Sequence, residues 1–105
     1  MEHFPHLKCL YFEGNAITSM AGLETNVELL SLYLHENCIN EMAHISTLKN
    51  LKVLNLSDNC IRKIDGLSGL NIDTLYLARN RIGFEGIEDL KGLLECKSIT
   101  CVDLQ

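Results

Sequence analysis

The residues of this chain that could bind a metal ion or act as nucleophile and base are its five cysteines and four histidines. The cysteines are not arranged as a zinc site, because no CxxC pair is matched by a second such pair. Their odd number, in a chain that does not open with a secretory signal, is typical of a reducing compartment in which thiols stay free. We therefore expect no metal, no cofactor and five free thiols, at Cys9, Cys38, Cys60, Cys96 and Cys101.

The histidines do not indicate catalysis either. His3, His6 and His44 have no cysteine, histidine or carboxylate at a convincing ligand spacing, and His35 stands alone. A lone histidine of this kind is more often a hydrogen-bonded surface residue than a catalyst. The sequence also lacks a phosphate-binding loop, a nucleophile elbow and a pair of carboxylates placed for acid–base work. We predict that the protein is not an enzyme.

The composition and net charge of the chain further limit the classes of protein to which it could belong. The chain has 105 residues, of which 47% are hydrophobic, and this suits one domain of modest size. Its net charge of −5 and the absence of a strong basic face argue against direct nucleic-acid binding. No apolar run approaches the roughly 20 residues that a membrane-spanning helix needs. We expect a cytoplasmic protein that contacts neither membrane nor nucleic acid.

A repeat positions these side chains, and it is marked by four asparagines spaced 22, 22 and 21 residues apart, namely Asn15, Asn37, Asn59 and Asn80. Each asparagine ends an LxxLxLxxN pattern, an isoleucine follows two residues later, and a fifth copy begins at Ile99. We predict one domain over residues 1–105, with repeats at 7–28, 29–50, 51–71, 72–98 and 99–105. Neither end carries a polar capping element, so we expect a fragment of a longer protein, with uncapped ends that favour self-association.

The pattern predicts a leucine-rich-repeat solenoid of the α/β class. Within LxL the leucines point to one side and the residues between them to the other. Coils stacked about 4.8 Å apart then build a parallel β-sheet on a concave face and bury a continuous apolar column. Each asparagine amide is expected to bond backbone groups left open by the turn after the strand, which gives the four asparagines a structural role.

The second half of each repeat predicts the convex side. Its apolar residues recur about every third position, as at Met42, Ile45 and Leu48, which suits short 3₁₀ or irregular turns. The fourth repeat is longer, and its extra residues carry apolar positions at helical spacing. We predict one amphipathic α-helix near residues 85–95.

The alternation also selects the residues that face a partner. All three tyrosines fall in one column of the repeat, together with an asparagine and an aspartate. Tyrosine is enriched at interfaces, but it also has high β-propensity and packs across strands, so both interpretations stay open. We predict a partner-binding concave face made of Tyr11, Glu13, Tyr33, His35, Asn55, Ser57, Tyr76 and Asp103.

Two further pairs occupy equivalent positions in neighbouring repeats. Cys38 and Cys60 each follow an asparagine and should stack one coil apart, within reach of a disulfide; we expect buried free thiols rather than a bridge. Asp58 and Arg79 should also lie one coil apart and form a solvated ion pair.

The repeat unit resembles the Sds22-like subclass of leucine-rich-repeat proteins, and among them most of all the dynein axonemal assembly factors. The stretches at 7–15, 51–59 and 87–104 carry a resemblance that covers about residues 7–105. The sequence departs from the pattern of this subclass at three positions. Phe12 replaces a leucine, and Met20 and Met42 replace isoleucines.

That resemblance implies a protein-binding scaffold of the cytoplasm, or of a cilium or flagellum. Its role would be the preassembly of axonemal dynein arms, with dynein chains or assembly chaperones as partners. The same subclass leaves two alternatives: a docking module of the phosphatase-regulator or axonemal dynein light-chain type, and a scaffold of splicing ribonucleoproteins.

Overall fold

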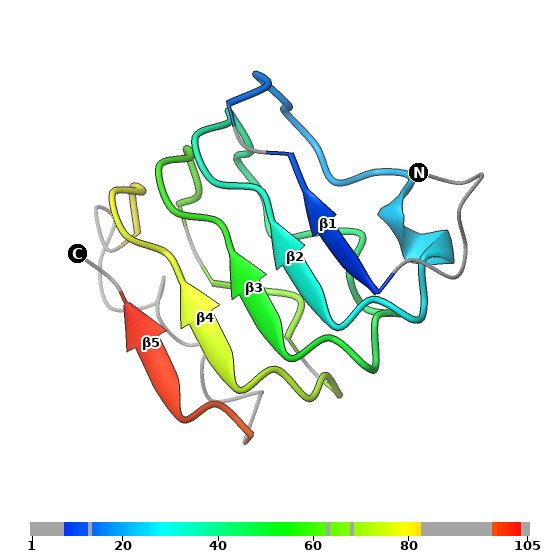
Figure 1. Cartoon of the computed structure of the whole chain (residues 1–105). Coiled ribbons are helices and arrows are strands. Elements are labelled where there is room, and N and C mark those ends of the chain that lie inside the picture. The colour runs from blue at the N-terminus through cyan, green and yellow to red at the C-terminus, as the bar shows by residue number, and fades with distance from the viewer. Residues whose placement is uncertain (1–7, 13, 63, 68, 83–97, 104–105) are drawn as a thin grey trace.

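The computed structural model describes residues 8–12, 14–62, 64–67, 69–82 and 98–103. In this part of the chain, five short strands form one parallel sheet in which strand order follows sequence order (Figure 1). The strands are β1 (Cys9–Tyr11), β2 (Ser31–Tyr33), β3 (Val53–Asn55), β4 (Thr74–Tyr76) and β5 (Cys101–Asp103). A single turn of 3₁₀ helix, η1 (Leu23–Thr25), lies between β1 and β2. The predicted solenoid is confirmed, while the exact repeat boundaries stay a prediction.

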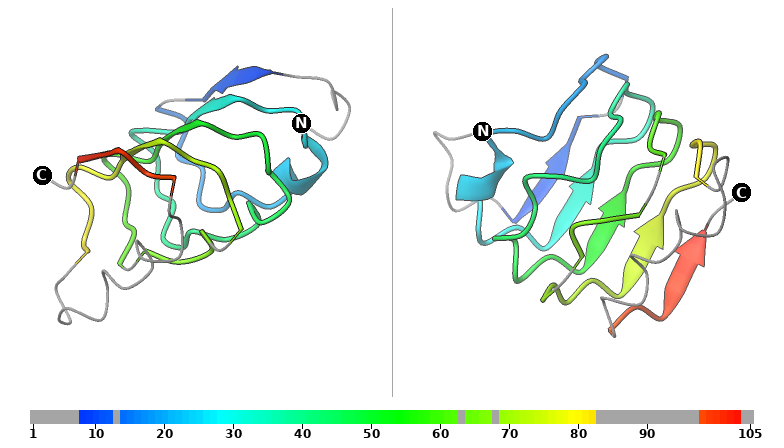
Figure 2. Two further views of the ribbon diagram at one scale, coloured as in Figure 1. Left: turned by 90° about the horizontal axis from the view of Figure 1, so that it is seen from below. Right: turned by 180° about the vertical axis from the view of Figure 1, so that it is seen from behind.

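The strands pair in the register that the repeat predicts. Leu10 pairs with Leu32, and the same central position continues through Leu54 and Leu75 to Val102. Beyond the first four strands, backbone amides donate to the next coil, as from Leu34 to Asn55 over 2.9 Å and from Leu56 to Tyr76 over 2.8 Å. Figure 2 shows the coils one behind another, with the strands along one side of the stack.

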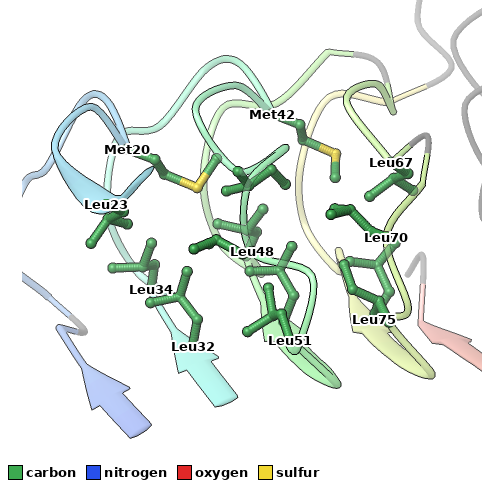
Figure 3. Packing of buried hydrophobic residues seen from close by; sticks show 14 of the residues in the cluster. Met20, Leu23, Leu32, Leu34, Met42, Leu48, Leu51, Leu67, Leu70 and Leu75 are labelled. Carbon is green, nitrogen blue, oxygen red and sulfur yellow. The ribbon is translucent and has the colours of Figure 1, made fainter. Parts of the chain in front are cut away.

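The core is the column of apolar side chains enclosed by these coils. The strand leucines and the apolar residues of the opposite segments pack together, and both methionines at convex positions take part (Figure 3). Met20 and Met42 are 2% and 3% exposed, so the substitution of isoleucine by methionine keeps these positions in the core. Burial of this apolar surface is the main stabilising force of the fold.

Short turns build the convex side, as the spacing by three predicts. Amide-to-carbonyl bonds between residues three apart recur at one position of successive coils, from Asn26 to Leu23, from Leu48 to Ile45 and from Leu70 to Leu67. Each such bond closes a 3₁₀ turn, and only at η1 does the turn extend into a helix. The helix predicted near 85–95 lies outside the described residues. Among those residues no helix is long and apolar enough to cross a membrane.

One position of the convex turn has a left-handed backbone in three successive coils. Gly22 (φ 98°), His44 (φ 65°) and Gly66 (φ 72°) are 22 residues apart, and two of them are glycine. A β-carbon at Gly66 would lie 2.6 Å from the carbonyl oxygen of Met42 in the preceding coil. The positive φ favours glycine at 66 without requiring it, as His44 shows, whereas the close approach of the two coils leaves no room for a β-carbon there.

Candidate interaction surface

An asparagine ladder fixes the turn that follows each strand. The side-chain amide of Asn59 donates to the carbonyl of Leu34 in the preceding coil over 3.0 Å, and to Leu56 and Ser57 of its own coil. Its Oδ1 atom accepts from the backbone amide of Ile39 over 2.9 Å. The same set of bonds recurs at the positions one coil before and one coil after, Asn37 and Asn80.

This ladder carries out the role predicted for Asn37, Asn59 and Asn80. Each amide satisfies backbone groups of two coils at once, in an interior where an unpaired polar group is costly. Asn37 and Asn59 are buried, whereas Asn15 in the first coil is exposed and its backbone amide donates to Asn37 Oδ1. The rigid turn so formed fixes where each strand ends.

A second set of coil-to-coil bonds was not predicted. At the opposite edge, the side-chain amides of Asn50 and Asn71 donate to the carbonyls of Val27 and Lys49 in the preceding coil. The two asparagines are 21 positions apart and occupy equivalent places in neighbouring repeats, so alignment of the repeats could have identified them. These bonds brace the edge at which the strands begin.

The tyrosine strip is the column that runs across the sheet at one position of every strand. Its members are Cα partners in successive pairs, in the order Tyr11, Tyr33, Asn55, Tyr76 and Asp103. Tyr11 is 62% exposed, and the other four are partly exposed. The rings of Tyr11 and Tyr33 stack, with centroids 4.5 Å apart and planes 3° from parallel.

The remaining predicted face residues have different surroundings. His35 is half-buried beside the strip, and Glu13 lies outside the described residues. The Oδ1 atom of Asn55 accepts from the backbone amide of Ser57 over 3.1 Å, so this side chain also closes its own turn.

The expectation that Ser57 faces solvent is wrong. Ser57 is 6% exposed, and its hydroxyl oxygen accepts from the backbone amide of Ala78 over 3.2 Å. Ala78, the equivalent residue one coil later, is buried as well. The strands are only three residues long, so strict alternation of sides ends before this position is reached.

The expectation that Cys38 and Cys60 are buried is also wrong, although both are free thiols. Cys38 is exposed and Cys60 half-buried. Each stands between two buried residues, Asn37 and Ile39 in the first case, and the alternation of an extended segment turns the middle residue outward. Cys9 and Cys101 are free and exposed, and Cys96 lies outside the described residues.

The predicted ion pair is confirmed at the edge where the strands end. Arg79 Nε donates to Asp58 Oδ1 over 2.6 Å, and Nη2 donates to Oδ2 over 2.9 Å. These hydrogen bonds hold the pKa of the Asp58 carboxyl below its ordinary value, and they raise the pKa of the guanidinium. Asp103 and Glu36 add to the latter shift by attraction.

The backbone favours this pairing. Glu36, Asp58 and Arg79 all have φ between 56° and 60°, at the position where the first coil has Gly14. The repeated left-handed residue sends successive side chains out at the same edge, so that charges in neighbouring coils meet. In the described part of the chain, no group of three or more histidine, cysteine or acidic residues could hold a metal ion.

Residues 41–82 match the family model described as leucine rich repeat. An internalin (inlF) from Listeria monocytogenes is similar in structure, with a TM-score of 0.84 and 28% identity over 99% of this chain and 30% of the internalin. An internalin C2 from the same organism aligns with a TM-score of 0.87 and 25% identity over 98% of this chain and 44% of the other. The chain thus spans less than half the length of either internalin. No curated protein matches the sequence.

Proposed function

We propose that this chain, which has the leucine-rich-repeat fold, is a non-catalytic protein-interaction module that binds its partner across the tyrosine strip. The observation that carries the proposal is the register of the sheet, which aligns three tyrosines on one face of a five-stranded sheet. Leucine-rich-repeat proteins generally act as protein-interaction scaffolds, which supports the same function.

The strip suits binding because its geometry is set before a partner arrives. Every member sits on a strand whose ends are fixed by backbone and asparagine bonds, so little backbone order has to be gained on binding. The stack of Tyr11 on Tyr33 restricts both rings further. Preorganised aromatic side chains near the middle of a surface are typical hot spots.

The chemistry of the strip indicates the kind of partner. Its tyrosines offer apolar area with a polar rim, and Asp103 places a carboxylate at one end. An α-helix or extended segment with apolar and basic side chains complements this arrangement.

Substitution of Tyr33 tests the proposal, with melting and partner affinity measured on the same protein. Tyr33→Ala should lower stability by about 1 kcal/mol, since the side chain is only half-buried, and weaken binding by about 2 kcal/mol or more. Val27→Ala is the matched control, because Val27 is 46% exposed and lies away from the sheet face in the segment before β2. Equal affinity of the Tyr33→Ala and Val27→Ala variants would move the binding site elsewhere.

The finer proposal is a scaffold for the preassembly of axonemal dynein arms. The resemblance of residues 7–105 to the dynein assembly factors supports it. Capture from a flagellated cell, with the parent chain and the Tyr33→Ala variant as paired baits, should enrich dynein chains or assembly chaperones on the parent alone. Enrichment of a phosphatase catalytic subunit or of splicing proteins would assign the chain to one of the two alternatives.

A further inference from the structure

The chain has three arginines, and all three line one pocket. The pocket is an open surface hollow with a volume of about 600 Å³. Its walls are Asn59, Cys60, Arg62, Arg79, Asn80 and Arg81. None of the lining residues in the described part of the chain is a carboxylate, although Asp58 borders the pocket through its bonds to Arg79.

Two neighbouring coils build the pocket at the edge where the strands end. The loops after β3 and β4 lie side by side there (Figures 1 and 2). The backbone amide of Arg81 donates to the carbonyl of Ile61 over 2.8 Å, and the amide of Ile61 donates to Asn80 Oδ1 over 3.0 Å. These bonds fix the backbone from which the arginines project.

The ion pair with Asp58 orients the side chain of Arg79 but uses only some of its N–H donors. A guanidinium has five N–H donors, and Arg79 uses two of them on Asp58. Three donors of Arg79 are therefore left for another acceptor. Arg81 is exposed, so water or a ligand can reach it, whereas Arg62 is also exposed but already takes part in another interaction.

We propose that this pocket binds the phosphate group of a phosphorylated side chain in a partner protein. Planar guanidinium groups bind phosphate oxygens in pairs, and a phosphate dianion can engage more than one of them. None of the lysines in the described part of the chain is among the lining residues, so the positive charge contributed by those residues comes from forked guanidinium donors.

A phosphorylated peptide fits better than a nucleic acid. A polyanion would be repelled over its length by a chain of net charge −5, whereas one phosphate responds mainly to the nearby arginines. The inference rests on the proposed protein-binding function but not on the tyrosine strip. It adds that the partner would be phosphorylated.

An NMR titration of the ¹⁵N-labelled chain tests the inference, with N-acetyl-phosphoserine amide as the probe. The backbone amides of Arg62, Arg79 and Arg81 should shift saturably, and less so as salt is raised, while N-acetyl-serine amide should leave them unchanged. Arg81→Gln should weaken the affinity for the phosphoserine probe by about tenfold, because the change removes a charged donor. Lys52→Gln, an exposed change outside the pocket, should bind like the parent.

Several outcomes would overturn the inference. They are the absence of saturable shifts, equal affinity of the Arg81→Gln and Lys52→Gln variants, and tighter binding of inorganic phosphate than of the phosphoserine probe. Displacement of that probe by a single-stranded RNA at lower concentration would assign the pocket to nucleic acid instead. Melting of both variants checks that the fold is intact. Tyr33→Ala should leave the titration unchanged, so failure of the strip and failure of the pocket are distinguished.

Discussion

The ring of Tyr11 lies on the ring of Tyr33, with centroids 4.5 Å apart and planes 3° from parallel. The two residues are 22 positions apart and become Cα partners through the pairing of β1 with β2. The stack is compatible with both interpretations of the tyrosine column, because it packs one face of each ring across the strands and also restricts the movement of both rings. Tyr76 pairs instead with Asn55 and Asp103.

A double-mutant cycle should measure this stack. Tyr11→Ala and Tyr33→Ala together should destabilise the chain by less than the sum of the two single changes, with a coupling of about 0.5–1.5 kcal/mol. Tyr11→Ala and Tyr76→Ala, which share no ring contact among the described residues, are the control pair and should be additive. Denaturant unfolding of each variant gives the required free energies, and strict additivity of the first pair would contradict the stack.

Loss of a ladder asparagine should destabilise the fold according to its burial. Asn59→Ala removes three donated bonds and one accepted bond in a buried site, at a cost of about 2–3 kcal/mol or more. Asn15→Ala is the matched change at an exposed position of the same column and should cost less. If the two variants unfold at the same denaturant concentration, burial is not what makes the ladder important.

Two glycines with similar positive φ should respond differently to alanine. At Gly14 (φ 70°) an added β-carbon meets nothing within 4 Å, so Gly14→Ala should cost only the left-handed strain of about 1–2 kcal/mol. At Gly66 the same β-carbon lies 2.6 Å from a carbonyl oxygen, and displacement of that backbone should add about 1–3 kcal/mol. Thermal unfolding compares the pair, and equal losses would refute the close approach of the coils.

Removal of the arginine partner should raise the pKa of Asp58. The two hydrogen bonds from Arg79 hold the pKa of this carboxyl below its ordinary value of 3.8. Because the folded-state pKa is the lower one, the pair stabilises the fold above that ordinary value, and the contribution is lost as pH falls through the folded-state pKa. A carboxyl ¹³C titration should show a higher midpoint in Arg79→Gln than in the parent or in Lys52→Gln; unchanged midpoints would contradict the pairing.

All five cysteines should be recovered as thiols when the native protein is alkylated and then denatured. Cys9, Cys38 and Cys101 are exposed and should react first, whereas half-buried Cys60 should react more slowly. Mass spectrometry after short labelling times resolves the order. Recovery of only three thiols would indicate a bridge between Cys38 and Cys60.

The strands and the ladder were predictable because each is dictated by a repeated local rule. Leu10, Leu32 and Leu54 recur at one position, and only a parallel stack buries all of them together. The alternation rule failed at Ser57, where it was extended past the end of a three-residue strand into a turn.

The arginine pocket could not be predicted from the spacing. Arg62, Arg79 and Arg81 occupy three different positions of the repeat, so no column of the alignment brings them together. They meet because the turns after β3 and β4 are adjacent and because the left-handed residue at 79 directs one side chain outward. A turn conformation of this kind depends on bonds to the neighbouring coil, which a single repeat does not reveal.

The asparagine bonds give the stack a direction. Asn37, Asn59 and Asn80 each reach back to the coil before them, so every coil relies on its successor to satisfy its own backbone. Removal of a coil from the N-terminal end of the stack and removal from its C-terminal end should therefore leave different backbone groups unpaired. Loss of the first coil leaves Asn37, Asn59 and Asn80 with acceptors in their own turns. Loss of the coil that holds Asn80 instead removes the acceptor of the Ile61 amide and leaves the Leu56 carbonyl with its bond from Asn59.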